Sequence, residues 1–258
     1  MSKAITEYCS NSSPTTTTTT THCTCIGIDA DPNMVDRAKE QFPNIRFEQG
    51  DVRNFKLYDK ESNSNDNGND SLLQVDAIFS NAALHWIKED GQKEAISNMS
   101  KYLKSGGRFV VEFGGKGNVE KITSAAIQAI HKKRSTNDSK QDKMISNPWY
   151  FPSIGEYCTL LQEYGNIEVT SAILFDRPTP LEDGANGLKN WLRMFGTSTS
   201  LFQNVIKREV EEGCNNAEEH VEEILNEIDT TLRPILFDEK QNQWFADYRR
   251  IRIVGKKL

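Results

Sequence analysis

The sequence contains no long apolar segment and no excess of positive charge. No stretch of it approaches the roughly 20 consecutive apolar residues that a helix needs to cross a bilayer. Its 31 Lys and Arg residues are outnumbered by 37 Asp and Glu residues, which gives a net charge of −6. Because contacts with nucleic-acid phosphates require a basic surface, this balance argues against a nucleic-acid partner. We therefore expect a protein that binds neither a membrane nor a nucleic acid.

Cysteine is also scarce, with five residues at positions 9, 23, 25, 158 and 214. An odd and scattered set of this kind does not predict a disulfide framework. His22, Cys23 and Cys25 lie close together, but no second pair of ligands follows at the spacing of a zinc site, so we expect no metal. The start of the chain also lacks the apolar core of a secretory signal. These features predict a reduced protein of the cytoplasm.

Strand-forming and helix-forming patterns alternate in the first half of the chain. Short apolar runs predict strands at 24–28, 45–48, 75–80 and 108–113. Asp31 and Pro32 mark the start of one helix, and apolar residues at helical spacing predict another from about 91 to 103. Strands and helices joined in this order by short turns are typical of parallel βαβ units. We therefore expect an α/β fold with a doubly wound, mostly parallel sheet.

The second half of the chain is richer in helix signals. The predicted helices lie near 119–130, 154–164, 188–195 and 201–232, and the predicted strands lie at 166–175 and 248–257. The last strand is expected to be antiparallel, at one edge of the sheet. We expect one domain that covers residues 1–258, with a mostly helical cap at about 181–237.

Acidic or amide side chains follow three of the predicted strands, at Asp29, Asp51 and Asn81. In doubly wound sheets, ligands bind beyond the carboxyl ends of the strands. Asp29 is placed to accept hydrogen bonds from both ribose hydroxyls of a nucleoside, and Asp51 to accept one from an adenine amino group. A single Asp at a strand end is more often a helix cap or a turn former. Three such residues in order favour a nucleoside site, and we expect them to converge on one cleft.

Several segments together resemble a known enzyme family. IGIDADPNMVDRAKEQFP, FEQGDVRNF, DAIFSNAALHWI and LKSGGRFVVEFGGKGN are similar to the successive motifs of class I S-adenosylmethionine-dependent methyltransferases. NPWYFPSIGEY, RPTPLEDGANGLKNWLRMFG and WFADYRRIRIVGKK resemble the trans-aconitate methyltransferase family, which esterifies a small carboxylic acid. The resemblance runs from about Ile26 to Lys257. It implies a Rossmann-like methyltransferase fold, S-adenosylmethionine as cofactor and a small carboxylic acid as substrate.

The resemblance also implies roles for individual residues. It places six residues at the cofactor, which are Asp29, Ala30, Asp51, Val52, Asn81 and Ala82. Because a carboxylate is ionised at neutral pH, its methylation requires no general base, and the enzyme has only to orient the acid and steady its charge. The cationic, aromatic and imidazole candidates for this task are His85, Trp86, Tyr150, Trp191, Arg193, Tyr248 and Arg249. Each has a structural alternative, because aromatic side chains also form cores and arginines also lie at surfaces.

Glycine is absent from residues 1–26, where the resemblance requires it. The family begins with a strand and a Gly-x-Gly-x-Gly loop whose backbone approaches the cofactor, and only glycine permits that approach. The segment SKAITEYC resembles the helix that follows this loop. We therefore expect a sheet that lacks the family's first strand, in a truncated chain that binds the cofactor weakly or not at all.

Three functions are compatible with these features. The first is carboxyl O-methylation of a small organic acid such as trans-aconitate, and the intact Asp29 and Asp51 favour this enzymatic ancestry. The second is a non-catalytic, methyltransferase-like binding module, which the missing glycine loop favours. The third keeps the enzyme but assigns it a longer, lipid-like acid.

Overall fold

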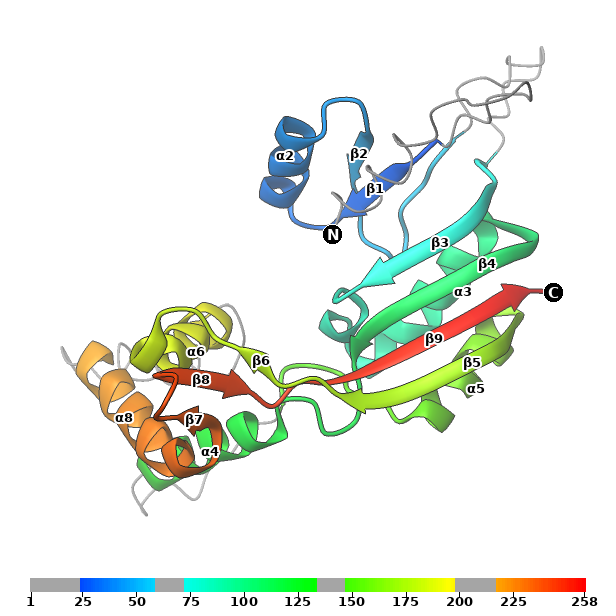
Figure 1. Ribbon diagram of the computed structural model, residues 1–258. Coiled ribbons are helices and arrows are strands. Elements are labelled where there is room, and N and C mark those ends of the chain that lie inside the picture. The colour runs from blue at the N-terminus through cyan, green and yellow to red at the C-terminus, as the bar shows by residue number, and fades with distance from the viewer. Residues whose placement is uncertain (1–23, 59–71, 134–146, 198–216) are drawn as a thin grey trace, which may run out of the picture. The chain divides into compact units, whose positions relative to one another are not determined.

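The computed structural model describes residues 24–58, 72–133, 147–197 and 217–258 (Figure 1). The chain divides into two compact units, Met1–Leu72 and Leu73–Leu258. The segment without glycine, with its resemblance to a family helix, lies almost entirely outside the described residues.

The first unit contains a small βαβ element. It comprises strand β1 (Ile26–Asp29), helix α2 (Pro32–Gln41) and strand β2 (Arg46–Gln49), and the two strands pair in parallel. The predicted helix start is confirmed, because the Asp31 carboxylate accepts a hydrogen bond from the backbone N–H of Asn33 and Pro32 opens the first turn. The apolar side chains of α2 are only partly covered: Val35 is 3% exposed, whereas Met34 is 48% exposed. Adjacent helical residues point about 100° apart, so burying one need not bury the other.

The second unit is built on a four-stranded sheet in the order β3–β4–β9–β5. Its strands are β3 (Val75–Asn81), β4 (Leu103–Gly114), β5 (Ile167–Asp176) and β9 (Arg249–Lys257). β3 and β4 are parallel, and β9 runs antiparallel to both of its neighbours. The predicted α/β fold is therefore confirmed, with a sheet that is mixed in strand direction.

The last strand is antiparallel as predicted, but its expected place at the sheet edge is wrong. β9 lies between β4 and β5, and Ile251 and Ile253 on it are fully buried. Gly255 allows β5 to lie close, because a Cβ atom there would stand 2.5 Å from Cγ2 of Ile167. The alternating sequence of β9 thus reflects one covered face of the sheet and not an exposed edge.

Two helices cover one face of this sheet, α3 (Gln92–Tyr102) and α5 (Ile154–Gly165) (Figure 1). On the opposite face, Phe79 of β3 and Ile173 of β5 are half-exposed. The helix predicted from about 91 to 103 is confirmed as α3, which ends at Tyr102, and β4 begins at once. Gly106 has a φ of 79° within β4, where the register against β3 shifts, so this glycine serves the strand and not the helix end.

The rest of the second unit is a helical group with a small sheet. Its helices are α4 (Glu120–Lys133), α6 (Gly187–Thr197) and α8 (Ala217–Leu236), and the short 3₁₀ helix η3 (Gly184–Asn186) leads into α6. Two further 3₁₀ helices, η1 (Leu84–Trp86) and η2 (Glu89–Gly91), lie between β3 and α3 in the chain. The strands β6 (Thr179–Pro180), β7 (Phe237–Asp238) and β8 (Gln243–Ala246) pair in the order β6–β8–β7. Of the helix predicted at 201–232, residues 217–232 are confirmed and residues 201–216 lie outside the described part of the chain.

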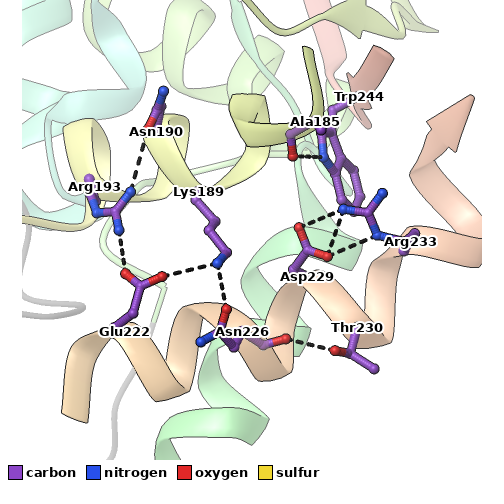
Figure 2. A network of polar contacts seen from close by, with 10 residues as sticks. All are labelled: Ala185, Lys189, Asn190, Arg193, Glu222, Asn226, Asp229, Thr230, Arg233 and Trp244. Atoms are coloured by element: carbon purple, nitrogen blue, oxygen red, sulfur yellow. Dashed lines mark hydrogen bonds and ion pairs between the residues drawn. The ribbon is translucent and has the colours of Figure 1, made fainter. Parts of the chain in front are cut away.

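The helical group has its own apolar core, which includes Trp244 and Ile228. Polar contacts join α6 to α8 at its surface: Lys189 Nζ lies 3.0 Å from a Glu222 carboxylate oxygen, and Arg193 pairs with the other oxygen of Glu222 (Figure 2). Exposed ion pairs of this kind contribute about 0–1 kcal/mol each, so the core and not this network holds the group together.

Replacing Gly155 by alanine is expected to raise the free energy of unfolding by about 0.5 kcal/mol, because alanine restricts the unfolded chain and favours the helix. Gly155 lies in the first turn of α5, and a Cβ atom there would meet nothing within 4 Å. At the other end of the same helix, a Cβ at Gly165 would stand 2.9 Å from Ile167 Cγ1, so Gly165→Ala should destabilise. Urea denaturation of both variants checks this, and a shift in the same direction would contradict it.

Candidate functional site

In the first unit, Asp29 and Asp51 lie at the same edge of the parallel pair β1–β2. Asp29 ends β1 opposite Gln49, and Asp51 follows two residues after Gln49. The Asp29 carboxylate accepts one hydrogen bond, from the backbone N–H of Asp31 to Oδ1 at 2.9 Å. Its other oxygen has no partner among the described residues, so this exposed carboxylate is able to accept a hydroxyl hydrogen from a ligand.

Asp51 is engaged more fully than Asp29. Nε of Arg53 lies 3.0 Å from each of its oxygens, and Nη2 lies 2.5 Å from Oδ2. This hydrogen bonding from Arg53 holds the pKa of Asp51 below its ordinary value, although partial burial acts against it. Ala30 and Val52, the predicted neighbours of the two acids, are exposed and half-buried respectively.

In the second unit, the chain turns sharply after β3. Asn81 ends the strand, and Ala82 has a φ of 56°, in the left-handed region that residues with a Cβ rarely adopt. The Ala82 backbone N–H donates to the Glu112 carbonyl at 2.8 Å, which holds the turn against the end of β4. Strained backbone conformations of this kind are common at functional sites. The sequence does not reveal this one, because alanine is not a residue type that favours a positive φ.

His85 is buried just beyond this turn, in η1. Its Nδ1 atom accepts a hydrogen bond from the backbone N–H of Gly114 at 3.4 Å. Burial lowers the pKa of His85 to about 3, and the charge of Arg250 adds to the effect. The imidazole is therefore neutral at physiological pH. The backbone N–H of Tyr150 donates to the His85 carbonyl at 3.0 Å, which brings a second candidate to the same place.

An aromatic cluster lies beside His85 and consists of Trp86, Trp149, Phe151, Trp191 and Phe195. Neighbouring rings have centroids 4.8–6.2 Å apart, and the cluster draws on η1, on the segment before α5 and on α6. Trp86 is 44% exposed, whereas Trp191 is almost fully buried. The predicted residues Trp86 and Trp191 therefore lie in one cluster, although only Trp86 presents much of its ring to solvent.

Trp191 connects this cluster to Tyr248 and Arg250. The Trp191 indole Nε1 donates to the Tyr248 hydroxyl oxygen at 2.8 Å. The Arg250 guanidinium lies over the Tyr248 ring, with its Cζ atom 4.7 Å from the ring centroid. The Nε atom of Arg250 is buried without a hydrogen-bond partner among the described residues. Arg250 is the residue that the sequence interpretation missed, although its type and its place beside Arg249 are visible in the motif.

The structure places the two predicted arginines elsewhere. Nε of Arg249 lies 3.2 Å from an Asp176 carboxylate oxygen, and Arg193 pairs with Glu222 at the surface of the helical group (Figure 2). Of the seven predicted substrate residues, five are thus linked by contacts around η1, which are His85, Trp86, Tyr150, Trp191 and Tyr248.

Two further findings concern the described ranges. Among their helices, none is long and apolar enough to cross a membrane. Within the same ranges, no three His, Cys, Asp or Glu side chains gather as ligands for a metal ion.

Comparison with known proteins agrees with this architecture. Residues 8–109 match the model of a methyltransferase domain family. The chain is 28% identical over 235 residues to an uncharacterized methyltransferase of Schizosaccharomyces pombe, which covers 90% of this chain and 77% of the relative. It is also 28% identical over 90 residues to a trans-aconitate 2-methyltransferase of Deinococcus radiodurans, but this match covers 34% of the chain and 28% of that enzyme.

A solved structure supports the fold. The crystal structure of the YcgJ protein of Bacillus subtilis matches 91% of this chain and 82% of its own, with a TM-score of 0.51 and 16% sequence identity. The mixed α/β sheet, the matched domain and the relatives agree with the predicted class. The chain is an S-adenosylmethionine-dependent methyltransferase, with S-adenosylmethionine as its cofactor.

Proposed function

We propose that this methyltransferase transfers the methyl group to a carboxylate oxygen of a small organic acid. In this reaction the carboxylate oxygen forms a bond to the methyl carbon, and the bond from that carbon to sulfur breaks with its electron pair left on sulfur. The cofactor supplies the electrophilic methyl group. The proposal rests on one observation, which is that neither His85 nor the two tyrosines linked to it, Tyr150 and Tyr248, is poised to remove a proton at neutral pH.

Four titratable side chains near η1, those of His85, Tyr150, Tyr248 and Glu112, are poor bases for physical reasons. His85 is neutral with a pKa of about 3, and its Nδ1 lone pair is already engaged by Gly114. Burial raises the pKa of Tyr150 to about 12 and also raises the pKa of Tyr248. The Glu112 carboxylate lies 3.0 Å from Arg177 and 2.6 Å from Arg252, so both of its oxygens are engaged by guanidinium groups.

The lack of a base selects the kind of acceptor. An amine or a hydroxyl group must lose a proton to complete methyl transfer, and a positioned base assists that loss. A carboxylate with a pKa near 4 is ionised at neutral pH and carries no proton to remove. The partial match to a trans-aconitate 2-methyltransferase supports a small polycarboxylic acid as the substrate.

For the cofactor, we assign Asp29 and its neighbour Ala30 to the ribose, since Asp29 has an exposed oxygen free to accept a hydrogen bond. Asp51 and Val52 are assigned to the adenine. Because Arg53 engages both Asp51 oxygens, it must release one of them before Asp51 accepts a hydrogen bond from the adenine amino group. Asn81 and Ala82 are assigned to the methionine end. The match to the methyltransferase domain family covers residues 8–109 and supports a single methyltransferase domain, with 181–237 proposed as its cap.

Methyl transfer with tritiated S-adenosylmethionine tests the proposal. The acceptors are trans-aconitate, a long-chain fatty acid, an amine and a phenol. Each is tested at a concentration of S-adenosylmethionine at which calorimetry shows that the protein binds this cofactor. We expect label in trans-aconitate in a form that mild base releases as methanol, because only a methyl ester hydrolyses in this way. Label that resists base, or label in the amine or phenol alone, would refute carboxyl methylation. Cofactor binding without transfer to any acceptor would favour the non-catalytic binding module.

A further inference from the structure

We propose that Arg250 and the hydroxyl group of Tyr248 form a binding site for a carboxylate of the substrate other than the one that is methylated. This inference rests on the proposed function and names the part of the site that selects the acid. It replaces Arg193 and Arg249, the two arginines that the motifs indicated, with their neighbour on β9.

The first argument is the unbalanced charge of Arg250. Three nearby arginines have carboxylate partners: Arg249 pairs with Asp176, and Arg252 and Arg177 both pair with Glu112. Arg250 has no ion pair within the described ranges, and its Nε atom is buried without an acceptor. An arginine side chain stays protonated even when it is partly desolvated. The Tyr248 ring and the charge of Glu112 offset part of the desolvation of this guanidinium, but neither gives its Nε atom an acceptor. An anion that binds there therefore removes a penalty as well as making new hydrogen bonds.

The second argument is the place of Arg250 in the sheet. It stands opposite Gly114 on β4 and opposite Phe175 on β5. Gly114 is the last residue of β4 and is the residue whose N–H binds His85. The guanidinium therefore lies at the carboxyl end of a parallel strand, which is where ligands bind in sheets of this class. The charge of Arg250 also acts on His85, which agrees with their proximity.

The third argument is the direction of the Tyr248 hydroxyl group. This oxygen accepts a hydrogen bond from Trp191 Nε1 at 2.8 Å, and no acceptor for its own hydrogen occurs in the described part of the chain. The hydroxyl is therefore available as a donor, directly beside the guanidinium that lies over its ring. Together the two side chains offer several N–H groups and one O–H group to an anion, and planar guanidinium matches the geometry of a carboxylate. Trp191 is a positioning residue, because it acts through Tyr248.

The bound carboxylate and the reacting one are different groups. A carboxylate held by a guanidinium and a phenol has its lone pairs engaged and its charge neutralised, so it is a weak nucleophile. The carboxylate that takes the methyl group must keep a free lone pair. The substrate therefore carries at least two carboxylates, which separates a polycarboxylic acid from a fatty acid by chemistry and not by length.

The test compares Arg250→Gln with Arg252→Gln, a matched control on the same strand and the same face. The probes are trans-aconitate, with three carboxylates, and crotonate, with one. Binding is followed by tryptophan fluorescence, because Trp191 contacts the site, and transfer is followed by kcat and KM. We expect Arg250→Gln to weaken trans-aconitate binding by about 10- to 100-fold and to raise KM in parallel, as for loss of hydrogen bonds to a charged group. Crotonate binding should change little, and Arg252→Gln should leave both probes as in the unaltered protein.

Further variants separate this role from a structural one. A structural arginine would lower the urea midpoint when removed, whereas Arg250→Gln is expected to leave it unchanged or raised. Arg250→Lys keeps the charge but not the fork of donors, so it should bind trans-aconitate with intermediate affinity. If Arg250→Gln fails to fold, Arg250→Lys takes its place in the binding comparison. Trp191→Phe should raise KM for trans-aconitate more than it lowers kcat.

Several outcomes would overturn the inference. Equal binding of trans-aconitate by the unaltered protein and Arg250→Gln would refute it while leaving methyl ester formation, and so the proposed function, intact. Failure of the unaltered protein to bind trans-aconitate more tightly than crotonate would also refute it. In contrast, selective binding that depends on Arg250 without any ester product would support the carboxylate site and refute the proposed reaction.

Discussion

Replacement of Trp244 by alanine is expected to lower the free energy of unfolding of the second unit by about 3–5 kcal/mol. Trp244 lies on the central strand of the small sheet and is fully buried. Its ring centroid is 5.1 Å from that of Phe237, and the Arg233 guanidinium lies 5.2 Å from it. Its indole N–H donates to the Ala185 carbonyl at 2.9 Å (Figure 2). Alanine would therefore leave a large cavity in the helical group, and the Ala185 carbonyl would lose its hydrogen-bond donor.

Urea denaturation followed by circular dichroism measures this loss. The matched control is Ile235→Ala, at an α8 side chain that is 56% exposed, where a change within about 0.5 kcal/mol is expected. Trp244→Phe should fall between the two, since it keeps an aromatic ring but removes the N–H. A loss below about 1 kcal/mol for Trp244→Ala would mean that this core contributes far less than its burial indicates.

The second large effect concerns pH and His85. In the folded protein its pKa is lowered to about 3 by burial, whereas the unfolded chain takes up a proton near the ordinary value of 6.5. The unfolded state therefore binds more protons between these two values. Above about pH 6.5 His85 is neutral in both states and has no effect on the free energy of unfolding. As the pH falls from 6.5 toward 3, only the unfolded state takes up the proton, so the free energy of unfolding decreases progressively. Because each pKa unit corresponds to about 1.4 kcal/mol, the loss is expected to reach about 2–3 kcal/mol by about pH 4.5.

His85→Asn isolates this effect. The asparagine side-chain oxygen is placed to accept the hydrogen bond from the Gly114 N–H, but it does not titrate. We expect the free energy of unfolding of the variant to fall less steeply between pH 6.5 and 4.5, by about the same 2–3 kcal/mol. The control is His131→Asn on the exposed surface of α4, which should follow the pH profile of the unaltered protein. Parallel profiles for the His85 variant and the unaltered protein would show that folding does not lower the pKa of His85.

Much of the fold could be predicted from local signals in the sequence. The start of α2 depends on Asp31 and Pro32, which act on the backbone within one turn, and the structure has both in these roles. The strand predicted at 75–80 from an apolar run is found at 75–81, and the strand predicted at 248–257 from an alternating pattern is found at 249–257. The order of these elements along the chain is sufficient to predict the α/β class, because strands that alternate with helices pack in few ways.

The candidate site was predicted only in part, and the misses share a cause. The sequence indicated Tyr248 and Trp191, which meet through a hydrogen bond, but it chose Arg249 over Arg250. These two arginines are chemically identical and adjacent, and successive residues of a strand point to opposite faces. The position of β9 between β4 and β5 decides which of them faces His85 and which pairs with Asp176.

The same distinction holds across the molecule. Composition and periodicity act within a few residues, so the sequence by itself determined the helices, the strands, the class of the sheet and the family motifs. Burial, and with it the pKa of His85 and the lack of an acceptor for Arg250 Nε among the described residues, depends on segments that lie more than 100 residues apart in the chain, such as β4 and β9. Only the tertiary structure decided those properties, because the desolvation of a charge is set by every group packed around it and not by its neighbours in sequence.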